Sequence, residues 1–121
     1  MKDRKTLLVI VRQSPYGSSL ARASLDTALA AAALEQPVSL LFMGDGVLQL
    51  LPDQHSEAIG VKNIGRLLGS LPLYDIESVY IDAGAAARYQ LDTKELVLTV
   101  KPADPAAMRR LINDCDNVIG F

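Results

Sequence analysis

Few side chains in this sequence could do covalent chemistry. The chain has one cysteine, Cys115, and one histidine, His55. Cys115 lies between Asp114 and Asp116, and neighbouring carboxylates oppose the thiolate form that makes a cysteine reactive. The sequence therefore favours a structural thiol, and a nucleophilic Cys115 is the alternative.

His55 stands in a polar stretch at positions 53–57. A catalytic triad would need a nucleophile in a recognisable turn, and no such pattern occurs. A zinc site needs about four good ligands, which one histidine and one distant cysteine do not supply. We expect no metal and no cofactor, and we interpret His55 as a solvated loop residue.

The stretch 15–19, with the sequence PYGSS, separates a predicted strand from a predicted helix. Backbone N–H groups at a helix start can hold an anion. The stretch lacks the lysine of a P-loop and the glycines of a dinucleotide fingerprint. A turn with Ser18 or Ser19 as the helix N-cap is the simpler interpretation. An anion site at Gly17, Ser18 and Ser19 is the alternative.

Strand-like and helix-like segments alternate along the chain. Apolar runs predict strands at 5–11, 37–43, 78–82, 95–100 and 117–121. Helical spacing predicts helices at 18–35, 59–71, 83–89 and 104–115, the last with Asp104 as its N-cap and Pro105 at its first position. This alternation predicts a single three-layer α/β/α domain over residues 1–121, with a five-stranded parallel sheet.

Asp82 ends the third predicted strand. In an open α/β sheet, ligands bind beyond the carboxyl ends of the strands. The carboxylate of Asp82 could be functional there, or it could cap the helix that follows. The sequence leaves both interpretations open.

The helix predicted at 18–35 holds seven alanines and four leucines. Its main apolar stripe runs through Leu25 and Leu29, but Leu20 and Leu34 lie on other sides. A helix that is apolar nearly all round is covered on both sides. A sheet covers only one side in a small domain, so we expect a partner subunit on the other.

Bulk composition excludes several classes of protein. The net charge is −2, which gives no electrostatic footprint for direct binding of nucleic acid. The basic pair Arg109 and Arg110 is interpreted as a solvated helix face. No apolar run approaches the ~20 residues that span a bilayer, and 5–11 is too short for a signal peptide. With a single cysteine, these features predict a cytoplasmic protein.

Four stretches resemble the DsrE/DsrF-like sulfur-relay proteins, and within them the TusC/DsrF subunit type. They are PYG before a helix that contains SLD, DGVLQLLP at 45–52, LYDIE at 73–77, and the D-x-V-I-x-F pattern at 116–121. In order, they cover nearly the whole chain. The resemblance implies the DsrEFH-like α/β/α fold predicted above.

The resemblance also implies a partnership. TusB/DsrH-like and TusD/DsrE-like subunits would join this chain in a heterohexamer, a dimer of heterotrimers. That complex passes persulfide sulfur toward the 2-thiouridine of the tRNA wobble base. In the relay, the sulfur carrier is a cysteine of the TusD/DsrE-type subunit at the end of the third strand. Asp82 occupies that position here, and an aspartate cannot form a persulfide.

This chain is therefore expected to be a non-catalytic structural or recognition subunit. The large apolar side chains of the stretch 44–52 are unusual for a loop and must be covered by the protein's own core or by another surface. We predict interface residues in this stretch and on the helix at 18–35. They are Leu20, Leu34, Asp45, Val47, Leu48, Gln49, Leu50 and Leu51. Two alternatives remain, a stand-alone homo-oligomer that binds a small anion or nucleotide, and a sulfur carrier that uses Cys115.

Overall fold

A computed structural model describes residues 5–14, 20–51 and 68–121. Its five strands form one sheet in the order β4-β3-β2-β1-β5, and every neighbouring pair is parallel. The strands are β1 Leu7–Val11, β2 Val38–Phe42, β3 Ser78–Asp82, β4 Lys101–Ala103 and β5 Asn117–Gly120. The predicted five-stranded parallel sheet is confirmed.

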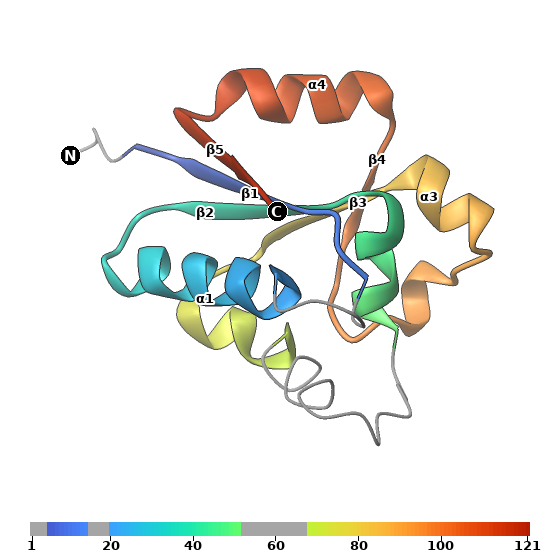
Figure 1. The fold of residues 1–121 in the computed structure, drawn as a ribbon, viewed down its shortest axis with the longest axis horizontal. Coiled ribbons are helices and arrows are strands. Elements are labelled where there is room, and N and C mark those ends of the chain that lie inside the picture. The colour runs from blue at the N-terminus through green and yellow to red at the C-terminus, as the bar shows by residue number, and fades with distance from the viewer. Residues whose placement is uncertain (1–4, 15–19, 52–67) are drawn as a thin grey trace.

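Helices lie on both faces of this sheet (Figure 1). The α-helices are α1 Leu20–Ala33, α3 Ala83–Arg88 and α4 Pro105–Asp114, and the short 3₁₀ segments are η1 Gly44–Leu50, η2 Leu71–Tyr74 and η3 Thr93–Glu95. In Figure 1, α1 covers one face and α4 the other, which confirms the three-layer α/β/α architecture. Asp104 caps α4 as predicted, because its carboxylate accepts a hydrogen bond from the N–H of Ala107 at 2.8 Å.

The main hydrophobic core fills the space between the sheet and α1. Strand side chains alternate between the two faces. Leu7, Val9 and Val11 of β1 face this core, where they meet Leu25 and Ala28 of α1. The opposite face is covered more thinly, since none of the residues of α4 is buried.

The prediction of a fourth strand at 95–100 was wrong. This segment is irregular after η3, and β4 begins only at Lys101, opposite Tyr80 of β3. The backbone N–H of Val97 donates to the carbonyl of Leu50 at 2.9 Å instead of joining the sheet. Leu98 is nevertheless buried in the core. The apolar residues that suggested a strand therefore line a connection that closes over the core.

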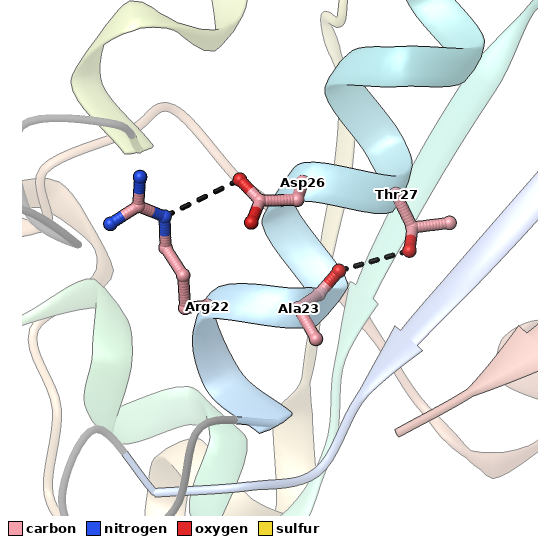
Figure 2. Close-up of polar contacts among 4 residues, drawn as sticks. All are labelled: Arg22, Ala23, Asp26 and Thr27. Carbon is pink, nitrogen blue, oxygen red and sulfur yellow. Dashed lines mark hydrogen bonds and ion pairs between the residues drawn. The ribbon is translucent and has the colours of Figure 1, made fainter.

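Helix α1 has one buried side and one exposed side. Leu25, Ala28 and Ala31 are buried, whereas Arg22 and Asp26 form an exposed ion pair one turn apart, with Nε and Oδ1 at 3.3 Å (Figure 2). The leucines predicted for an interface lie at the two ends of this helix: Leu20, its first residue, is 44% exposed, and Leu34, just after its last residue, is 82% exposed. The start predicted at 18–19 lies outside the described residues, as does the helix predicted at 59–71 up to position 67.

Candidate functional site

Asp82 is the last residue of β3, and its carboxylate lies between the carboxyl end of β3 and that of the neighbouring β2. Its Oδ1 accepts hydrogen bonds from the N–H groups of Gly84 and Ala85 at 3.0 and 3.2 Å. Its Oδ2 accepts from the N–H of Gly44 at 3.4 Å. Asp82 is therefore the N-cap of α3 and also ties that helix to the start of η1. The capping interpretation is confirmed.

Two glycines explain how η1 can turn so close to the end of β1. Gly44 has φ +53°, a left-handed conformation that glycine adopts without a steric penalty. At Gly46, an added Cβ would lie only 2.0 Å from the carbonyl oxygen of Val11. The Gly-x-Gly pattern at 44–46 is thus required by the backbone path.

Three residues predicted for the interface point into the molecule. Val47, Gln49 and Leu50 are each 0% exposed, and the Gln49 Nε2 donates to the backbone carbonyl of Gln13 at 2.7 Å. In this structure they pack within the chain's own fold and are not available to a partner. The cause is the 3₁₀ turn of η1, which directs these side chains inward where an extended loop would have left them exposed.

Asp45 leaves this buried cluster and faces outward. Its Oδ1 accepts a short hydrogen bond from the hydroxyl of Tyr89, which follows α3. This hydrogen bond raises the pKa of Tyr89 above its ordinary value, and desolvation and the charge of Asp45 act in the same direction. The guanidinium of Arg88 lies 5.6 Å from the Tyr89 ring centre. The sequence patterns did not single out Tyr89, because its partner is 44 residues away.

Cys115 lies at the opposite end of the sheet from Asp82. It follows α4, just before β5 begins. The neighbouring Asp116 is anchored to Thr6, which precedes β1, and the Thr6 N–H to Asp116 Oδ2 distance is 2.9 Å. The five residues of β1 separate the two ends by about 13 Å, at about 3.3 Å per residue. Cys115 therefore does not share a site with Asp82.

This arrangement has little capacity for chemistry of its own. Both carboxylate oxygens of Asp82 accept backbone hydrogen bonds, and no thiol lies beside them in the described part of the chain. Within the same residues, no group of three or more His, Cys, Asp or Glu could hold a metal ion. His55 and the predicted anion site at Gly17, Ser18 and Ser19 lie outside the described ranges.

What remains of the predicted interface is a set of exposed or half-buried side chains. Asp45 is exposed, and Leu48 and Leu51 are half-buried beside it. Leu20, at the start of α1, and Leu34, just after its end, are exposed. The contact of this set with a partner stays a prediction.

No helix in the described ranges has the length and apolarity needed to cross a membrane.

Comparison with solved structures places the fold among known proteins. The YchN protein from E. coli superposes with a TM-score of 0.84 at 23% identity, covering 97% of this chain and 99% of that one. A conserved protein of unknown function from Bacteroides thetaiotaomicron superposes with a TM-score of 0.65 at 11% identity, covering 95% and 94%. At these identities the likeness concerns the fold alone.

Sequence comparison gives closer relatives. A protein of Pseudomonas aeruginosa named TusC homolog is 37% identical over 115 residues, which cover 95% of this chain and 97% of that protein. A TusC homolog of Haemophilus influenzae is 33% identical over 114 residues, which cover 93% and 96%. The model of the DsrE/DsrF-like family matches residues 5–121. The chain therefore belongs to the DsrE/DsrF-like family.

Proposed function

We propose that this chain is a non-catalytic subunit of a cytoplasmic heteromeric sulfurtransferase relay, which serves 2-thiolation of the tRNA wobble uridine. The names of its relatives support the relay assignment. The observation that carries the non-catalytic role is Asp82. It stands at the end of β3, where the resemblance to the relay proteins puts a carrier cysteine in another subunit, and its carboxylate is used to cap α3.

The chain contributes surface to this assembly. We propose TusB/DsrH-like and TusD/DsrE-like subunits as its partners in a heterohexamer. The two ends of α1 support this proposal, because Leu20 at its start is 44% exposed and Leu34 just after it is 82% exposed. Leu48 and Leu51 extend the apolar surface at the carboxyl end of the sheet.

Co-expression with the two partner types tests the assembly. A stable hexamer is expected in size-exclusion chromatography coupled to light scattering. The variant Leu34→Asp should weaken assembly. Leu73→Asp is the matched control, because Leu73 is 84% exposed and Leu34 is 82% exposed, while Leu73 lies outside the predicted interface. Three proteins that stay apart, or two variants with equal effects, would contradict the proposed surface.

Transfer of labelled sulfur tests the non-catalytic role. Cys115→Ser in the reconstituted complex should leave the rate of sulfur transfer unchanged, whereas a serine at the carrier cysteine of the TusD-type subunit should abolish it. A relay that stops with Cys115→Ser would assign the carrier role to this chain instead. Mass spectrometry after incubation with a persulfide donor gives the same decision directly, through the presence or absence of a sulfur adduct on Cys115.

A further inference from the structure

The two edge strands of the sheet are built differently. The β4 edge carries Lys101, which is exposed, and Pro102, which has no N–H group. Charge and proline on an edge strand prevent pairing with another strand. The β5 edge has neither, and all four of its residues are exposed. The sheet is therefore protected at one edge and open at the other.

The β5 edge of the sheet has backbone N–H and C=O groups that point away from β1. Among the described strands, β5 pairs with β1 alone. The N–H groups of Asn117 and Phe121 donate to β1, at 3.0 and 2.9 Å from the carbonyl oxygens of Thr6 and Ile10. Because residues along a strand alternate in direction, Val118 and Gly120 point their N–H and C=O groups away from the sheet. A further strand beside β5 could form hydrogen bonds with these groups.

Apolar side chains flank this edge on both faces. Val118 is in register with Leu8 and Ile119 with Val9, so the two side chains lie on opposite faces. Val118 is 39% exposed and Ile119 is 40% exposed. Such an uncharged edge with apolar flanks is a template for β-pairing.

We propose that two copies of this chain pair antiparallel through β5, about a two-fold axis at Ile119. Val118 of each copy then stands opposite Gly120 of the other. In such a pair, the two facing residues exchange both N–H···O bonds. The two Val118–Gly120 pairs therefore make four hydrogen bonds in total, and the two Ile119 side chains meet across the axis. A register centred on Val118 would keep only one such pair within β5.

Charge at the ends of β5 supports a second copy as the occupant. The guanidinium of Arg12 lies beside Gly120, since its Nη2 would be 3.4 Å from a Cβ placed there. Asp116 precedes the other end of the strand. Antiparallel pairing brings opposite ends together, so the positive end of one copy meets the negative end of the other. In this register Asp116 lies diagonally across from Gly120 of the other copy, within reach of the long Arg12 side chain beside that glycine, and opposite charges at such positions attract.

This inference goes beyond the proposed relay function, because β5 lies outside the surface proposed for the other subunits. The test uses the full chain alone, in sedimentation velocity across the micromolar range. We expect a concentration-dependent dimer. Ile119→Lys should abolish it by placing two like charges at the axis, and Leu73→Lys, a change at an 84% exposed leucine outside both proposed surfaces, should leave it intact.

A second variant and a second readout separate strand pairing from simple apolar contact. Val118→Pro removes only an outward N–H, so the β1 bonds remain, and the dimer dissociation constant should rise about tenfold or more. Hydrogen exchange at the Gly120 amide should slow on dimerisation in the unchanged chain. A chain that stays monomeric, a dimer that survives both β5 variants, or a Gly120 amide that exchanges equally fast in monomer and dimer would each overturn the proposal.

Discussion

The two ends of the sheet use their polar and apolar groups in opposite ways. At the carboxyl end, Asp82 binds three backbone N–H groups and η1 buries Val47 and Leu50. At the amino end, Leu34 is 82% exposed and Cys115, which stands between two aspartates in the sequence, is half-buried. The carboxyl end of the sheet, where this architecture normally binds ligands, thus uses its side chains to stabilise the fold. The segment with the strongest family pattern therefore serves mainly to stabilise the fold.

Gly46 gives the largest expected effect at the carboxyl end. Gly46→Ala would push a Cβ to 2.0 Å from the backbone oxygen of Val11, in a strand that is paired on both sides. We expect a loss of about 4 kcal/mol or more in the free energy of unfolding, measured by urea titration. Gly69→Ala is the matched control, because no atom lies within 4 Å of its added Cβ. Equal losses for the two variants would remove the close approach as the reason for glycine.

Leucine truncations compare the two ends directly. Leu50→Ala should cost about 2–5 kcal/mol of unfolding free energy, because it leaves a cavity in the core. Leu34→Ala should cost about 0.5 kcal/mol or less in the isolated chain. If Leu50→Ala were as mild as Leu34→Ala, the carboxyl end would not be the stabilised one, and η1 would again be a candidate partner surface.

The carboxylates of Asp82 and Asp116 allow a further comparison of the two ends of the sheet. Asp82→Ala removes hydrogen bonds to three backbone N–H groups and should cost about 2 kcal/mol. Asp116→Ala at the amino end removes bonds only to Thr6 and should cost about 1 kcal/mol. Asp82→Asn keeps an acceptor oxygen and should retain most of the stability. Thermal unfolding of the three variants gives the order, and a reversed order would mean that Asp82 contributes little to the fold.

Tyr89 gives the smallest effect, and it depends on pH. The hydrogen bond to Asp45 raises the pKa of Tyr89 in the folded chain, so folding favours the protonated phenol. Its contribution to stability is fully present below the unfolded pKa of about 10 and is lost as the pH rises through the folded value. Tyr89→Phe should reduce stability slightly at neutral pH and lose this alkaline dependence. Urea titration at several alkaline pH values measures the free energy of unfolding of both proteins. The same dependence on pH in both would contradict the hydrogen bond between Asp45 and Tyr89.

Most of the fold followed from local patterns. The strand at 78–82 and the Asp-Pro start of the helix at 104–115 could be predicted because apolar runs and capping residues act over a few positions. The strand predicted at 95–100 failed, because apolar residues of a connection over the core resemble those of a strand. Only the register of β4 against Tyr80 distinguishes the two.

The candidate site was harder to predict. The apolar stretch 44–52 predicts an interface that includes Val47, Gln49 and Leu50, whereas the 3₁₀ turn of η1 directs these three side chains into the molecule. Asp45 was singled out, but its link to Tyr89 was not, since no short-range pattern joins residues so far apart in the chain. The sequence allows either role for Asp82, and only the positions of its three N–H donors distinguish a cap from a free carboxylate.

By itself, the sequence determined the alternation of strands and helices, the membership of a family, and the absence of a cysteine at position 82. These properties depend on residue type and on short spacings. Only the tertiary structure decided which side of each segment is buried, that Asp82 is a cap, and that Cys115 lies at the far end of the sheet. Those properties depend on contacts between distant segments, which local spacing does not specify.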